Sequence, residues 1–112
     1  MVKHLSYDKR FDILFVHNGF QKGDKFFGNE MIGDLVLDVS TKKRIVGIEI
    51  LNASLYLKDF GVTEMDLKEL KDAELTAELH KNQANLLLTL KTKRKEIPLK
   101  ITAPLEELPA IY

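Results

Sequence analysis

Three carboxylates, Asp34, Asp38 and Glu49, are the residues whose types and spacing could support chemistry in this sequence. They fall in two successive segments that read as strands, in positions that place them on one sheet face. Mg²⁺ and Ca²⁺ prefer oxygen ligands, so the cluster is a weak candidate metal site and would make the protein a metal-assisted hydrolase. The competing interpretation is a solvated polar face. We favour it, because no dedicated metal-binding loop fixes the ligand geometry.

The histidines His4, His17 and His80 are the only side chains of the usual general-base type. No serine or carboxylate has a spacing that would build a catalytic triad around them, so structural or surface roles are expected. The absence of cysteine removes disulfides, thiolate metal sites and thiol catalysis. The sequence therefore predicts no catalytic residue and no cofactor, and it favours a non-enzymatic role while leaving an enzyme open.

Two basic clusters, residues 42–44 and 91–95, fall where hairpin tips are expected. Hairpin tips can contact phosphates, but solvated lysines also gather there. The chain has 17 basic and 17 acidic residues, whereas a dedicated nucleic-acid binder has a basic excess. Weak nucleic-acid binding through these tips is an alternative that the composition does not favour.

The carboxylates are positioned by two strands around a polar turn at residues 40–44. Period-2 alternation predicts Leu35 and Leu37 on the same face as Val46, Ile48 and Ile50. Earlier, residues 2–7 and 11–17 predict a hairpin that brings His4 towards His17. Residues 25–30 predict a short strand, in which Phe26 and Phe27 are expected as a core aromatic pair, with an exposed contact as the alternative. After residue 51, Asn52 is the expected N-cap of a helix over residues 53–60, which ends at Gly61.

The second half of the chain has the clearest pattern. A capping box at residues 63–66 predicts a helix over 64–71, with Leu67, Leu70 and Met65 on its buried side. Beyond it, strict alternation and two-residue turns at 81–82 and 93–94 predict three strands. The predicted register sets Leu79 opposite Ala84, Ala77 opposite Leu86, Leu75 and Leu99 opposite Leu88, Leu90 opposite Ile97, and Lys91 opposite Glu96 as an ion pair. The apolar face of this sheet must pack against the first half, the helices or a second subunit.

These elements predict a mainly β (α+β) fold: two antiparallel β-meanders packed together, with two short helices between them. The 112 residues suit a single domain. Residues 1–60 form the first meander with its helix, and residues 61–112 the second helix, the three-stranded sheet and an apolar tail interrupted by prolines. The tail is expected to lie across the core edge of its own chain, with contact to a partner as the alternative. For that alternative, four side chains are weak candidates for an interaction surface: Leu105, Leu108, Ile111 and Tyr112.

Several stretches of the first half resemble the domain of unknown function 2283 family. They are residues 7–8 (YD), 12–15 (DILF), 34–38 (DLVLD) and, most specifically, 46–54 (VGIEILNAS). The similarity covers about residues 5–57, and the chain departs from the family pattern in the first turn and in carrying Asn52 where aspartate is commoner. The resemblance implies a small prokaryotic β-rich module without an established activity. Some members accompany small toxin-like proteins, so it also suggests an antitoxin-like partner role.

Taken together, these features predict a cytoplasmic protein-interaction module that forms a homodimer, with a protein hetero-partner as the alternative. The first ten residues have no apolar signal region and no apolar run reaches membrane-spanning length, so no membrane partner is expected. Abundant lysine and glutamate with only two glutamines and no cysteine lean towards a thermophilic source.

Overall fold

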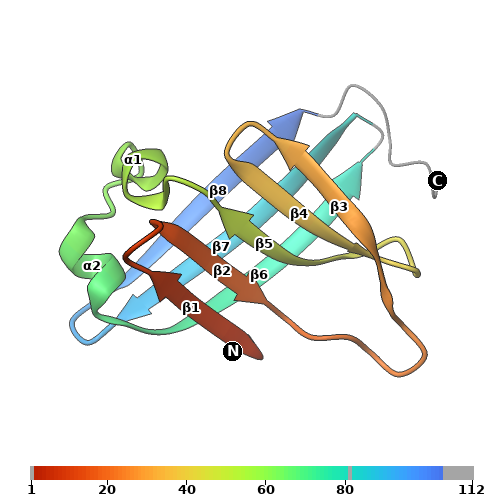
Figure 1. Ribbon diagram of the computed structural model, residues 1–112, viewed down its shortest axis with the longest axis horizontal. Coiled ribbons are helices and arrows are strands. Elements are labelled where there is room, and N and C mark those ends of the chain that lie inside the picture. The colour runs from red at the N-terminus through yellow and green to blue at the C-terminus, as the bar shows by residue number, and fades with distance from the viewer. Residues whose placement is uncertain (1, 81, 105–112) are drawn as a thin grey trace.

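A computed structural model describes residues 2–80 and 82–104 of the chain. Within them, eight strands and two short helices follow one another, and the strands form two antiparallel sheets (Figure 1). This confirms the predicted mainly β fold. The elements are β1 (His4–Asp8), β2 (Ile13–His17), β3 (Phe26–Ile32), β4 (Leu35–Ser40), β5 (Ile45–Ile50), α1 (Ala53–Lys58), α2 (Glu64–Lys68), β6 (Leu70–His80), β7 (Gln83–Thr92) and β8 (Glu96–Pro104).

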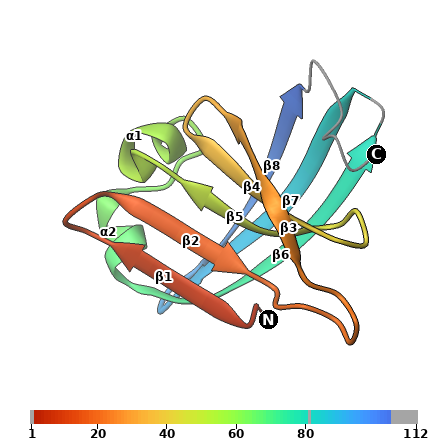
Figure 2. The same cartoon turned by 45° about the vertical axis from the view of Figure 1, so that its right-hand side comes forward.

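The two sheets lie face to face, and their strands cross rather than run side by side (Figures 1 and 2). The first sheet has the order β1-β2-β5-β4-β3 and the second the order β6-β7-β8. Both helices lie at one end of the two sheets, on the connection that carries the chain from β5 to β6. Crossed packing of this kind buries one face of each sheet and leaves the strands at the sheet edges uncovered by the partner sheet.

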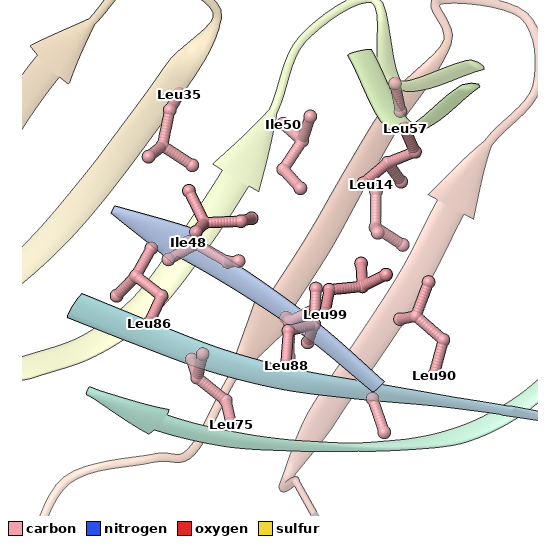
Figure 3. Close-up of a cluster of buried hydrophobic side chains, with 14 of the residues drawn as sticks. Leu14, Leu35, Ile48, Ile50, Leu57, Leu75, Leu86, Leu88, Leu90 and Leu99 are labelled. Atoms are coloured by element: carbon pink, nitrogen blue, oxygen red, sulfur yellow. The ribbon is translucent and has the colours of Figure 1, made fainter. Parts of the chain in front are cut away.

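The core forms between these two inner faces. Aliphatic side chains from both sheets point towards one another across the gap (Figure 3). As predicted, Leu35 lies opposite Ile50 and Leu37 opposite Ile48, so all four share the inner face. Val46 is fully buried, but it lies outside the cluster that these four residues join. A bulge after Asp38 pairs Val39 with Ile45, which moves Ile45 into the core cluster and leaves Val46 outside it. The main contributors are Leu14, Val16, Leu35, Leu37, Ile48, Ile50, Leu57, Leu75, Leu86, Leu88, Leu90, Leu99 and Ile101.

The register of the second sheet is the predicted one throughout the two hairpins. Leu79 lies opposite Ala84, Leu75 opposite Leu88, and the remaining predicted pairs follow in step. Lys91 forms the predicted ion pair with Glu96 at 3.9 Å, but its shorter contact, 3.0 Å, is with Glu74 on the other neighbouring strand. The apolar face of this sheet packs on the first sheet, which resolves the three alternatives that the sequence left open.

The helices are shorter than predicted. Gly61 adopts the expected left-handed conformation after α1 (φ 83°), and Thr63 and Asp66 form the expected capping box at the start of α2. However, α2 ends at Lys68 because Leu70 already begins β6. Met65 is 52% exposed, contrary to its predicted burial, while Leu67 is buried. No helix of the described residues is long and apolar enough to cross a membrane.

The predicted burial of Phe26 and Phe27 is wrong. Both side chains are about half exposed, 51% and 52%. They begin β3, an edge strand, where a bulge between Phe26 and Gly28 shifts the register against β4. A bulge at a sheet edge re-aims side chains and interrupts the pairing of the strand.

Candidate functional site

The three predicted carboxylates lie around β4 and β5. Asp38 and Glu49 project from the same face of the first sheet, as predicted, and Asp34 immediately precedes β4. Asp38 is nearly buried and accepts a hydrogen bond from the Asn29 side-chain amide at 2.7 Å. The Asn52 amide donates to Asp34 at 3.4 Å. Over residues 2–80 and 82–104, no three metal-ligating side chains come together in a group that could hold an ion.

The nearest ionisable neighbour of Asp38 is His17, on the far side of β5. Gly47 lies between them, paired with His17 on one side and with Asp38 on the other. Because Gly47 has no side chain, the imidazole lies over its backbone and brings Nε2 to 4.0 Å from Asp38 Oδ2. The other ring nitrogen, Nδ1, accepts a hydrogen bond from the Gly19 amide at 2.8 Å. The neutral tautomer that satisfies this bond carries its proton on Nε2, on the side of Asp38.

Burial dominates the electrostatics of this pair. It lowers the pKa of His17 below 6.5; Asp38 acts in the opposite direction, and His4 lowers the value further. Burial likewise raises the pKa of Asp38, partly offset by His17. His4 lies directly opposite His17 with the rings 6.1 Å apart, so the predicted approach of the two histidines is confirmed. A buried, hydrogen-bonded imidazole of this kind serves to fix the loop that follows it.

A second carboxylate, Asp12, organises the junction between the first hairpin and α1. Its oxygens accept from Tyr7 Oη at 2.6 Å, from the Ser54 amide at 3.0 Å and from Ser54 Oγ at 2.7 Å. Asn52 is the N-cap residue of α1, as predicted, but the predicted side-chain bond is not made: Asn52 adopts a left-handed conformation (φ 50°) and its side chain makes no capping bond. Asp12 supplies the acceptor from 42 residues away, which local sequence spacing could not indicate. Tyr7, Asp12 and Ser54 come from three of the stretches that resemble the DUF2283 family, and they meet at the Asp12 carboxylate.

The basic clusters occupy the two hairpin tips where they were predicted. At the second tip, three cations face nearby carboxylates: Lys91 with Glu74, Arg94 with Glu69 and Lys95 with Asp66, at 3.0, 2.9 and 3.4 Å. At the first tip, Arg44 Nε lies 3.6 Å from the buried carboxylate of Asp24. Asp24 also accepts hydrogen bonds from the backbone amides of Lys25 and Lys42 and so joins the loop before β3 to this tip; no pattern in the sequence indicates this role. Local pairing leaves less of this charge available for phosphates.

The outer edge of β6 is partly closed. The Val2 amide donates to the Ala73 carbonyl at 3.0 Å, and the Asn18 side chain donates to the Leu75 carbonyl at 2.9 Å. Because backbone groups of alternate residues point to the same side of a strand, Ala77 and Leu79 also direct their amides and carbonyls away from β7. In the described part of the chain, neither residue has a backbone partner on that side.

A groove of about 500 Å³ runs along this open stretch. The loop after β2 and the first basic tip form its walls, and β6 forms its floor. The inward-facing residues of β6 become more exposed towards the groove: Ala73 and Leu75 are buried, whereas Ala77 and Leu79 are partly exposed. The lining residues are Asn18, Gly19, Phe20, Gln21, Lys43, Arg44, Ile45, Leu75, Thr76, Ala77 and Leu79.

The other edge of the same sheet is protected differently. In β8, Pro98 lies opposite Thr89 and Pro104 lies opposite Gln83. By the same alternation that directs the backbone groups of Ala77 away from β7, the backbone nitrogens of these two prolines also face away from β7. Proline has no amide to donate, so β8 is a poor template for another strand. The sequence patterns did not lead us to assign the edge strands of this sheet. The signal was present, because β8 contains two prolines and β6 contains none, which distinguishes a protected edge from an open one. The interaction candidates Leu105, Leu108, Ile111 and Tyr112 lie outside the described residues.

Comparison with known proteins is informative for the first sheet alone. Neither a curated protein nor a solved structure matches this chain. A family model described as "Protein of unknown function (DUF2283)" matches residues 4–54, which run from the start of β1 to the second residue of α1. The match contains Tyr7, Asp12 and Ser54, the hydrogen-bonded group that joins the hairpin to the helix. Residues 4–54 are therefore similar to the DUF2283 family of proteins of unknown function, as their sequence motifs predicted.

Proposed function

We propose that this protein is a non-enzymatic interaction module that forms a homodimer through the open edge of β6. One observation supports the proposal above the others: Ala77 and Leu79 present unpaired backbone groups inside a groove. An extended segment can add to such an edge as a further strand, with main-chain hydrogen bonds giving affinity and side-chain contacts giving specificity.

The surroundings of the edge suit strand addition. Asn18 and Val2 occupy the first carbonyls of the edge, so an added strand would begin near Leu75 and run along the remaining stretch to Leu79. There it would cover the partly exposed side chains of Ala77 and Leu79. Burial of apolar area and pairing of free amides would both favour association.

The candidate polar sites support chemistry less well. Asp38 and Asp34 accept from side-chain amides, and His17 uses Nδ1 to hold the Gly19 amide. Asp12 accepts three hydrogen bonds that join β-hairpin to helix. These arrangements stabilise the fold, and for this reason we place function at the β6 edge rather than at the carboxylates.

The test uses proline to remove one outward amide. Ala77→Pro deletes the amide at the open edge of β6 without removing a bond to β7, and Lys100→Pro makes the matched change on β8, where Pro98 already occupies the same orientation. Solution mass is measured by size-exclusion chromatography with light scattering, and circular dichroism verifies that each variant is folded. We expect a dimer for the wild type and Lys100→Pro and a monomer for Ala77→Pro. A monomeric wild type, or a folded Ala77→Pro that remains dimeric, would overturn the proposal.

A further inference from the structure

We infer that the strand received by the β6 groove is residues 105–108 of a second copy of this chain. This inference rests on the proposed function and names the partner of the same edge. Three lines of argument support it: the charge of the groove, the length of the free edge and the position at which β8 ends.

The charge of the groove is complementary to this segment. The lining includes Lys43 and Arg44 and, among the described residues, no acidic side chain; Arg44 also faces the buried Asp24 carboxylate behind it at 3.6 Å. Residues 105–108 read Leu-Glu-Glu-Leu. In an extended strand successive side chains alternate between faces, so each face would carry one leucine and one carboxylate. Either orientation therefore directs an apolar and an acidic group towards Ile45 and the basic tip.

The backbone of the segment also suits the edge. Pro104 and Pro109 bracket it and cannot donate to a ladder, but the four residues between them can. Four residues of extended chain span about 14 Å, and the five residues from Leu75 to Leu79 span about 17 Å. The segment therefore fits within the stretch of β6 beyond the Asn18 contact. Pairing of one β6 with another would need a longer free edge, because Val2 and Asn18 already occupy its first half.

The end of β8 indicates that the segment comes from a second copy. Pro104 lies opposite Gln83 at the edge of the sheet remote from β6, since the strand order is β6-β7-β8. To reach the groove of its own subunit, the chain would have to cross three strand spacings, about 14 Å, pass the β6–β7 hairpin and reverse direction. Residues 105–108 would be consumed by that path. A segment that enters the groove of a second copy does not have to follow this path around its own sheet. If each copy places its segment in the groove of the other, the result is a closed two-fold dimer.

Cross-linking tests the contact directly, because the chain contains no cysteine. Single-cysteine variants Thr76→Cys and Leu108→Cys are made in full chains of different tag length, mixed and oxidised. We expect a disulfide-linked species of the combined mass. The control pairs Leu108→Cys with Met31→Cys, on the exposed surface of β3, and should give none. Equal cross-linking of both pairs, or none with Thr76→Cys, would overturn the inference.

Solution mass separates this inference from the proposed function. In the full chain, Leu105→Asp with Leu108→Asp should raise the dimer dissociation constant by about tenfold or more, since burial of the one leucine that faces the groove contributes about that much and the double variant removes it in either orientation. A dimer that is lost in Ala77→Pro but kept in this double variant would overturn the exchanged segment and leave the β6 edge as the dimer interface. A wild type that is monomeric at all concentrations would overturn both.

Discussion

The imidazole of His17 lies over Gly47, and a Cβ atom at position 47 would overlap the ring. This relationship spans three strands, because Gly47 on β5 separates His17 on β2 from Asp38 on β4. A glycine inside a strand usually weakens it, and here the ring of a neighbouring strand fills the space that the missing side chain leaves. The His17 ring also accepts a hydrogen bond from the Gly19 amide, so His17 and Gly47 together fix the start of the loop that lines the β6 groove.

Gly47→Ala should therefore destabilise the protein through steric overlap. The added methyl group must displace the His17 ring and also meets the Val16 carbonyl oxygen at 3.0 Å. Overpacking of a buried site costs about 1–3 kcal/mol, measured as the free energy of unfolding in urea. The matched control is Gly28→Ala on β3, where a Cβ meets nothing within 4 Å. Equal losses in the two variants would contradict the explanation, as would an undiminished loss for Gly47→Ala in a His17→Ala background.

Acid should destabilise the protein through His17. Its pKa in the folded state is lowered, chiefly by burial, so the unfolded chain takes up a proton at higher pH than the folded protein does. The stability linked to this residue is complete above pH 6.5 and declines as the pH falls below 6.5 towards the folded pKa. NMR titration of the ring should show His4→Gln raising the pKa of His17 and Asp38→Asn lowering it further. Shifts in the opposite directions would show that the charges do not act as the geometry requires.

Asp12→Ala should be among the most destabilising substitutions of a polar residue. It removes the acceptor of three hydrogen bonds, two of them at the first turn of α1. Loss of hydrogen bonds to this partly buried carboxylate costs about 2–3 kcal/mol. Asn52→Gly is the control at the position that local sequence would choose as the cap, and it should change the free energy of unfolding by less than about 0.5 kcal/mol, because glycine accepts the left-handed conformation. A larger loss for Asn52→Gly than for Asp12→Ala would contradict this assignment.

Tyr7 should ionise at unusually high pH. Burial, together with its hydrogen bond to the Asp12 carboxylate and the charge of that group, raises its pKa to about 12. Because the folded value exceeds the unfolded value of 10, the stability linked to Tyr7 is complete below pH 10 and is lost as the pH rises through 12. Tyrosinate absorbance of a Tyr56→Phe, Tyr112→Phe variant isolates this group. Asp12→Asn should move its midpoint towards 10, and an unchanged midpoint would exclude Asp12 as a cause.

Much of the fold could be predicted because its signals are local. The register of β6, β7 and β8 follows from strict alternation and short polar turns, since a slip of one residue would turn every leucine of a strand to the opposite face. The capping box of α2 lies within four residues and was equally predictable. Where a bulge intervened, as at Val46, the same period-2 reasoning did not predict which residue joins the core cluster, because one extra residue reverses the face of those beyond it.

The sequence by itself therefore determined the strands, their pairing within hairpins and the faces that must be buried. The tertiary structure decided which sheet covers which face, which edges stay open and which polar groups meet. Asp12 reaches Ser54 across 42 residues and Asn18 reaches the Leu75 carbonyl across 57. The first contact depends on the pairing of β2 with β5, the second on how the two sheets pack together, and no local pattern encodes either. Hydrophobic burial is periodic and can be read along the chain, whereas a hydrogen bond is made only where two distant backbones are brought within about 3 Å of each other.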